Sequence, residues 1–119
     1  YLIVNEFSLP EDSYYRPAVK AKCRDGFCAL SSDVVALSNP HNLTLTLLVN
    51  GEVRQENSTA NFVRSIPQLI TELSEFMTLH EGDVLITGTP EGRVDVQPGD
   101  EVVVEISGLG RLTNTIVAE

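Results

Sequence analysis

The sequence predicts a β-rich mixed α+β domain with one main helix, and three patterns support that class. Residues 43–49 alternate apolar and polar side chains with a period of two, and Asn50 and Gly51 follow directly. Residues 101–106 repeat the alternation. A period of two is typical of a strand with one buried face, and an Asn-Gly pair is a strong hairpin signal. Between these strands, apolar residues at helical spacing predict a helix over about 65–77.

The N-terminal part of the chain is expected to be extended. Residues 1–7 are apolar with β-branched members, which predicts a strand that carries Glu6 at its exit. Residues 18–30 predict an edge strand on which Lys20 and Lys22 point to the same face. Composition alone favours an ordinary exposed charge for Glu6 and a solvated, salt-bridged edge for the lysines.

The hairpin and the helix are predicted in more detail. The partner strand of the hairpin is expected over 52–56, with Val53 facing inward. Ser65 and Gln68 have the spacing of a capping box, and Pro67 is tolerated in the first helical turn. The apolar stripe of the helix consists of Ile66, Leu69, Ile70, Leu73, Phe76 and Met77. Burial of these side chains, at about 1.5–3 kcal/mol each, favours docking on the sheet, so the stripe is interpreted as core.

The C-terminal part predicts short strands separated by tight turns in a mixed sheet. Residues 84–86 are apolar and β-branched, which predicts a buried strand. This strand must end in the loop 87–92, because Pro90 has no N–H for a ladder. Turns are expected at Pro98 and at Gly108, and a final strand covers 111–117.

The loop 87–92 is a candidate binding element. It places the hydroxyls of Thr87 and Thr89, together with backbone N–H groups, at the end of a strand. That arrangement suits a carboxylate or another small anion. A tight connection without a ligand is the more common use of such a loop, so the loop alone favours that alternative.

The composition limits the partners and the compartment. The chain has 119 residues, 42% of them hydrophobic, which suits one domain with a core. The net charge of −9 disfavours nucleic acid and anionic membranes as partners. No apolar run reaches the roughly 20 residues of a membrane span, and no signal peptide is evident. We therefore expect a cytoplasmic protein, and the start at Tyr1 suggests a piece of a longer one.

The cysteines and histidines do not predict a zinc site. Cys23 and Cys28 would need two further ligands, and His41 and His80 stand at unrelated positions. Two reduced thiols are the favoured interpretation, and a disulfide across the intervening residues is the alternative.

Several motifs occur together in an order that resembles the C-terminal part of the fumarylacetoacetate hydrolase family. The likeness covers nearly the whole chain, and the Thr-Gly-Thr-Pro segment is its most specific part. The motifs are Asn5-Glu6, the run 21–28 that begins Ala-Lys-Cys-Arg-Asp-Gly, Val49-Asn50-Gly51 with Gln55, Gly82-Asp83, the loop 87–92, and Pro98-Gly99-Asp100.

The resemblance implies a fumarylacetoacetate hydrolase-like β fold and a divalent metal, Mg²⁺ or Mn²⁺. Glu6 stands where the family has an aspartate ligand, and the remaining ligands are expected upstream of Tyr1. Lys22 matches the lysine that works near the substrate in the family. Gly88 and Thr89 match the loop that holds a substrate carboxylate.

Arginines are candidates for the distal carboxylate of such a substrate. Arginine binds carboxylates through two parallel hydrogen bonds, so Arg16 and Arg24 are the residues considered. Tyr14, Tyr15 and Arg16 could line a pocket for an acidic substrate, and a packed loop is the equally favoured alternative.

The implied function is metal-dependent isomerisation or decarboxylation of a 2-hydroxymuconate or a 2-oxo dicarboxylate, in the catabolism of 4-hydroxyphenylacetate (homoprotocatechuate). The enzyme type is a 2-hydroxyhepta-2,4-diene-1,7-dioate isomerase or 5-oxopent-3-ene-1,2,5-tricarboxylate decarboxylase. Residues 1–119 are expected to form a single domain, the C-terminal part of a larger catalytic domain. That domain would work as a homo-oligomer or paired with a homologous half.

Two alternatives to this function remain. One is a non-catalytic half of a duplicated enzyme. The other is an acylpyruvate-type carbon–carbon hydrolase, which needs a base to activate water. Neither His41 nor His80 matches such a base in the family, which disfavours hydrolysis.

Overall fold

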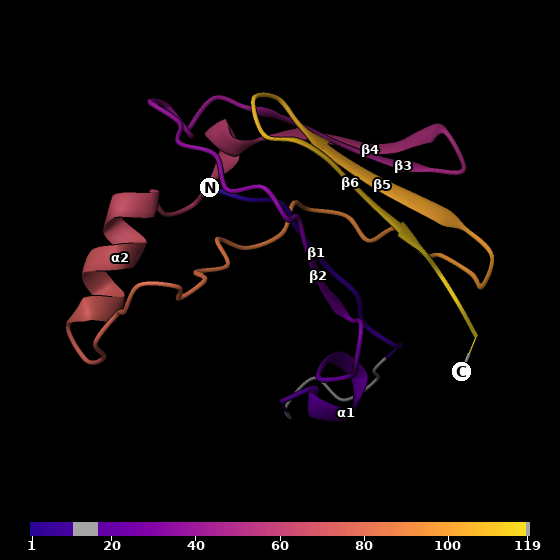
Figure 1. The fold of residues 1–119 in the computed structure, drawn as a ribbon, viewed down its shortest axis with the longest axis horizontal. Helices are drawn as coiled ribbons and strands as arrows, with labels where there is room; N and C mark the ends of the chain where they lie inside the picture. The colour runs from indigo at the N-terminus through magenta and orange to yellow at the C-terminus, as the bar shows by residue number, and fades with distance from the viewer. Residues whose placement is uncertain (11–16, 119) are drawn as a thin grey trace.

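The main element of the fold is a four-stranded antiparallel sheet with the strand order β4-β3-β5-β6 (Figure 1). The computed structural model describes residues 1–10 and 17–118. The strands of the sheet are β3 (Thr44–Val49), β4 (Glu52–Ser58), β5 (Glu101–Ile106) and β6 (Gly110–Thr115). The β-rich class with one main helix is therefore confirmed. Every strand pair in the described part is antiparallel, so the expectation of a mixed sheet was wrong.

The core lies along the central strand β5. Val102 is 1% exposed, and Val103 and Val104 are also buried. The alternation over 101–106 predicted a single buried face. Consecutive side chains of a strand point to opposite faces, so the structure buries both faces of β5. β3 and β6 pair with its two edges, so β5 also has no unpaired ladder edge.

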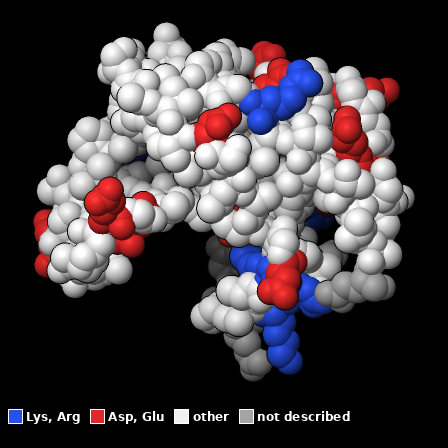
Figure 2. All heavy atoms as spheres, in the orientation of Figure 1, with Lys and Arg blue, Asp and Glu red and all other residues white. Residues whose placement is uncertain are grey.

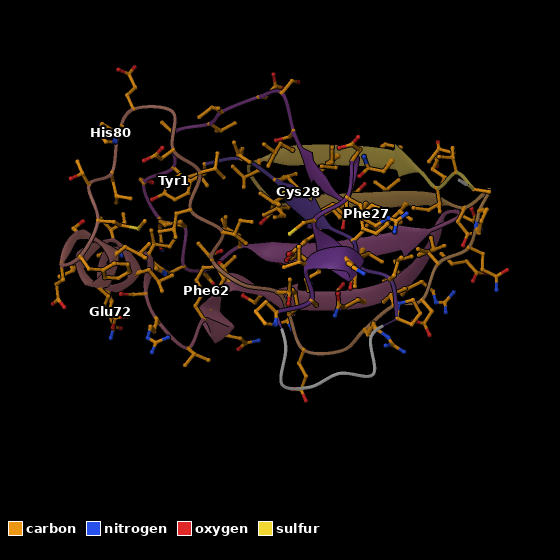
Figure 3. The ribbon with its side chains drawn as sticks, turned by 90° about the horizontal axis from the view of Figure 1, so that it is seen from below. Tyr1, Phe27, Cys28, Phe62, Glu72 and His80 are labelled. Carbon is orange, nitrogen blue, oxygen red and sulfur yellow. The ribbon has the colours of Figure 1, made fainter. Side chains whose placement is uncertain are left out.

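A two-stranded ribbon packs against this sheet. It consists of β1 (Val4–Glu6) and β2 (Cys28–Leu30), and the view from below shows it crossing the sheet (Figure 3). Ile3 is fully buried, and the buried side chain of Asn5 donates a hydrogen bond of 3.4 Å to Asn114 Oδ1 on β6. The predicted strand over 1–7 is thus confirmed for its middle.

The predicted edge strand over 18–30 is confirmed only for Cys28–Leu30, and the rest of that range is not a strand. Residues Val19–Lys22 form the short helix α1, in which Lys22 N–H donates to Ala18 O at 2.9 Å. Alanine and lysine are good helix formers and favour this turn. Positions two apart on a helix do not face the same way, so Lys20 and Lys22 do not share a face.

The β3–β4 hairpin turns as predicted. Asn50 and Gly51 have φ values of 51° and 81°, and two positive φ values define the turn that matches the twist of the strands. The inward position of Val53 was wrong, because its side chain is 58% exposed. Leu47 pairs with Gln55 and Leu48 with Val53, which leaves Arg54 as the extra residue of a bulge and redirects the strand.

The main helix, α2, covers Ile66–Ser74, so it begins as predicted but ends before the expected end at 77. The side chain of Ser65 accepts a hydrogen bond of 3.3 Å from Gln68 N–H. The interpretation of the apolar stripe as core was wrong. Only Ile66 is buried, and Phe76 is 75% exposed. Figure 1 shows α2 standing apart from the four-stranded sheet. Periodicity identifies an apolar face but not the surface that would cover it.

Residues 84–86 do not form the predicted buried strand. In the described part of the chain this segment has no ladder partner, and Val84 and Ile86 are exposed. A strand needs a neighbour for its backbone N–H and C=O groups, so apolar composition alone does not make one. No helix in the described ranges is long and apolar enough to span a membrane.

Two turns at one end of the sheet are joined by side chains. Asn50 Nδ2 donates to Asp100 Oδ1 at 2.8 Å, and Asn50 Oδ1 accepts from Glu101 N–H at 2.9 Å. Asp100 Oδ2 also accepts from Gln97 N–H at 2.8 Å. These two hydrogen bonds to the carboxylate, first that from Gln97 and then that from Asn50, hold the pKa of Asp100 below its usual value, and Arg54 lowers the pKa further.

Replacement of Asp100 by asparagine should lower stability at neutral pH. Because the folded-state pKa lies below the unfolded one, Asp100 stabilises the fold above about pH 3.9 and loses this effect as the pH falls through the folded pKa. Urea unfolding of the chain and of Asp100→Asn should give different midpoints at pH 7 and converge in acid. Asp33→Asn, in the loop before β3, is the matched control. A pH-independent difference for Asp100→Asn would contradict this assignment.

Candidate active site

The centre of the candidate site is an ion pair between two segments that the ribbon brings together. Lys22 Nζ lies 3.6 Å from Glu6 Oε1. Glu6 ends β1 and Lys22 ends α1, and Leu9 N–H donates to Ala21 O at 3.0 Å, which holds α1 beside the chain that leaves β1. Figure 2 shows basic side chains gathered over this lower part of the molecule beside acidic ones.

This ion pair is open to solvent. The side chain of Lys22 is 47% exposed and that of Glu6 30%. Pairs of this kind contribute about 0–1 kcal/mol to stability, because water screens the charges. The pair is therefore not needed to hold the fold, and both groups are accessible to a ligand.

The loop 87–92 is attached to the sheet by one side chain. Gln55 Nε2, from β4, donates to Glu91 O at 2.7 Å and to Gly92 O at 2.9 Å. Gly88 and Thr89 are exposed. Gly88 has a φ of 103°, a backbone angle that residues other than glycine rarely adopt. Gln55 fixes one end of the loop and leaves its other residues open.

Gln55 is a functional candidate that the sequence analysis did not name as a site residue. It appeared among the motifs of the resemblance, after Val49-Asn50-Gly51, and that position was the available signal. Its role depends on a contact 36 positions away along the chain, which no local pattern indicates.

Of the two arginine candidates, Arg24 lies within the described residues and contacts an aromatic ring. The guanidinium of Arg24 lies 5.8 Å from the ring centroid of Phe27, in the turn between α1 and β2. Figure 3 shows Phe27 near the start of β2. A contact of this kind favours the cation and orients it. Arg16, with Tyr14 and Tyr15, lies outside the described residues.

The described residues do not form a complete site for a divalent metal. No group of three or more His, Cys, Asp or Glu in the described ranges could hold an ion. Glu6 is a carboxylate, the ligand type that Mg²⁺ uses once or twice per site alongside water and substrate oxygens. His41 instead lies edge-on to Phe62 with 6.2 Å between the ring centroids.

The structure brings together some of the predicted residues and not others. Glu6 and Lys22 form a pair, and Arg24 follows Lys22 by two positions. Within the described ranges, no hydrogen bond or ion pair joins Gly88 or Thr89 to that pair. The arrangement offers an ammonium, a carboxylate and an open loop, which are groups that can bind an acid and stabilise negative charge.

Comparison with known proteins supports the interpretation of these motifs. Residues 1–117 match the family described as fumarylacetoacetate (FAA) hydrolase C-terminal. The chain is 51% identical over 124 residues to the 4-hydroxyphenylacetate degradation bifunctional isomerase/decarboxylase of Escherichia coli. That match covers 100% of this chain and 29% of the relative, so the chain spans less than a third of that protein.

Solved structures with a similar fold include enzymes that share 35% or more identity with this chain. One similar structure is 5-carboxymethyl-2-hydroxymuconate delta-isomerase from Mycobacterium smegmatis, with a TM-score of 0.82 and 39% identity over 87% of this chain and 41% of that one. Another is maleylpyruvate hydrolase from Sphingobium sp. SYK-6 in complex with manganese (II) ion and pyruvate. Its TM-score is 0.74, with 35% identity over 78% of this chain and 36% of that one.

Replacement of Gln55 by leucine should loosen the loop 87–92. The substitution removes both hydrogen bonds to Glu91 and Gly92 at similar side-chain volume. We expect trypsin to cleave after Arg93, which follows the loop directly, several-fold faster, since proteolysis follows local opening. Cleavage after Arg111, within β6, serves as the internal reference.

Glu56→Gln, one position further along β4, is the matched control and should leave cleavage after Arg93 unchanged. Equal cleavage rates for the native chain and Gln55→Leu would mean that Gln55 does not hold the loop.

Proposed function

The chain belongs to the fumarylacetoacetate hydrolase family, and on that premise we propose that residues 1–119 form the C-terminal part of a larger catalytic domain. The proposed reaction is isomerisation or decarboxylation of a 2-hydroxymuconate or 2-oxo dicarboxylate in 4-hydroxyphenylacetate catabolism. The observation that carries this proposal is the Glu6–Lys22 pair, with 3.6 Å between Nζ and Oε1. The name of the 51% identical relative states the same two reaction types.

Lys22 is proposed to act on the oxygen of an enolate. Loss of a proton from the carbon beside a carbonyl places negative charge on that oxygen, and an ammonium at hydrogen-bond distance stabilises this charge. Return of the proton to a different carbon completes an isomerisation. In decarboxylation, the electrons of the broken carbon–carbon bond flow into the same carbonyl, carbon dioxide leaves, and a proton takes its place.

Glu6 is proposed to be one ligand of Mg²⁺ or Mn²⁺, with the remaining ligands upstream of Tyr1 in a longer polypeptide. A divalent metal, when bound, supplies further stabilisation of charge on a substrate oxygen. The presence of manganese and pyruvate, a 2-oxo acid, in the maleylpyruvate hydrolase structure supports this assignment. The hydrogen bond from buried Asn5 to Asn114 joins the residue directly before Glu6 to strand β6.

The two ends of a dicarboxylate are assigned to different segments. Gly88 and Thr89 are proposed to bind one carboxylate through backbone N–H groups and a hydroxyl. Arg24 is proposed for the distal carboxylate, because it follows Lys22 by two positions and its guanidinium lies over the ring of Phe27. Arg16 stays a candidate for the same role.

A non-catalytic half is the second candidate function. It is favoured by one observation, the lack of a complete metal-ligand cluster within the described ranges. Hydrolysis of an acylpyruvate is less favoured, since His41 lies against Phe62. The backbone N–H of His80 donates a hydrogen bond to Asp83 Oδ2 in the turn that follows it.

Replacement of Lys22 by methionine should reduce the kcat for a 2-hydroxymuconate-type substrate by about 10²–10³-fold, the usual contribution of one donor to developing negative charge. The assay follows loss of substrate absorbance with the longest natural polypeptide that contains this sequence. Lys20→Met, on the same helix, is the matched control and should retain activity. Because the Glu6–Lys22 pair is exposed, the urea midpoint of Lys22→Met should stay close to that of the native protein.

Calorimetry with Mn²⁺ tests the role of Glu6. Binding should be lost in Glu6→Gln and kept in Glu52→Gln. Binding by neither the native protein nor its variants, together with no turnover, would favour the non-catalytic half and overturn the enzyme proposal. Activity of Lys22→Met within about threefold of the native value would remove Lys22 from the chemistry.

A further inference from the structure

The chain between α1 and β2 forms a loop that returns close to its starting point. Phe7 N–H donates to Phe27 O at 2.7 Å, and Leu9 N–H donates to Ala21 O at 3.0 Å. Two residues of chain span at most about 7 Å, so these two anchors lie close together. The loop 22–26 is therefore held closed at both ends by one short segment.

A tight turn lies inside this loop. Phe27 N–H donates to Arg24 O at 3.2 Å, and Gly26 has a φ of 77°. In a four-residue turn the first and last Cα atoms are less than about 7 Å apart. Cys23 and Cys28 flank the turn directly, one on each side.

Both cysteines are held at defined positions, and both thiols are accessible. Cys23 caps the end of α1, where its N–H donates to Val19 O at 2.8 Å, and Cys28 is the first residue of β2. Both are free thiols with exposed side chains. Figure 3 shows Cys28 on the ribbon that crosses the sheet. A disulfide requires Cα atoms about 4.4–6.8 Å apart, a span that residues flanking a tight turn can meet.

The thiols also lie beside the Glu6–Lys22 pair. Cys28 is the register partner of Glu6 in the β1–β2 ladder. Cys23 is the residue after Lys22. A bond between the two sulfurs would therefore link the backbone of Lys22 to the strand opposite Glu6.

We propose that Cys23 and Cys28 form a redox-active dithiol that low-molecular-weight disulfides oxidise reversibly to an intramolecular disulfide beside the Glu6–Lys22 pair. One cysteine thiolate attacks a sulfur of the small disulfide, forming a mixed disulfide and releasing one thiol. The second cysteine then attacks the protein sulfur of that mixed disulfide and releases the second thiol. Two protein thiols lose two electrons and two protons, and one small disulfide becomes two thiols.

This site is independent of the proposed enzymatic reaction. The disulfide is detected by peptide mass, whereas the enzymatic reaction is detected by substrate turnover. Failure of either proposal therefore leaves the other intact. Oxidation would constrain the backbone directly after Lys22, which would link the redox state to the position of that ammonium.

Equilibration in glutathione buffers, followed by trypsin digestion, tests the proposal. The protein is the longest natural polypeptide that contains this sequence. Trypsin cleaves after Lys22 and Arg24, so the disulfide joins the dipeptide 23–24 to the peptide 25–54. We expect this linked species, 2 Da lighter than its reduced parts, and its loss on addition of reductant. Cys28→Ser should instead yield a glutathione adduct on Cys23.

Comparison of the folded protein with the same protein in urea shows whether the fold favours the bond. Preorganised ends raise the effective concentration of the partner thiol, so the folded state should favour the disulfide by about tenfold or more. Glutathione adducts on both cysteines, bonds only between molecules, or less disulfide in the folded state than in urea would each overturn the proposal.

Discussion

The four-stranded sheet is the constraint on which both parts of the site depend. Its strand β4 holds the loop 87–92 through Gln55, and its strand β6 contacts the ribbon through Asn114. The two strands are at opposite edges of the sheet, so their separation is set by β3 and β5 between them. Val102, Val103 and Val104 are buried in β5, which ties the register of the sheet to the burial of apolar side chains.

The site combines a rigid frame with open functional groups. Asn5 is buried and hydrogen-bonded, whereas its neighbour Glu6 reaches out to Lys22. Gln55 has both its donors engaged, whereas Gly88 and Thr89 remain exposed. This division suits binding, since a ligand replaces water at groups whose supports do not have to move.

Local signals predicted the elements, and long-range contacts decided what they do. Asn50-Gly51 and the Ser65 cap are specified within four residues, and both were predicted correctly. Val84 and Phe76 are apolar, but the sequence does not show whether another part of the chain covers them, and both are exposed. Glu6 and Lys22 were identified as site residues through a family resemblance. Their pairing needed α1, a helical turn within the range that had been predicted as an edge strand.

The bulge at Arg54 has a consequence for how the protein behaves at high concentration. It interrupts an edge strand that also carries Glu52 and Glu56, and it breaks the regular spacing of the edge N–H and C=O groups. A foreign strand that approached this edge would meet charge and mismatched hydrogen bonds. The irregularity that turned Val53 outward thus makes β4 a poor template for amyloid-like growth, despite the β-rich composition of the domain.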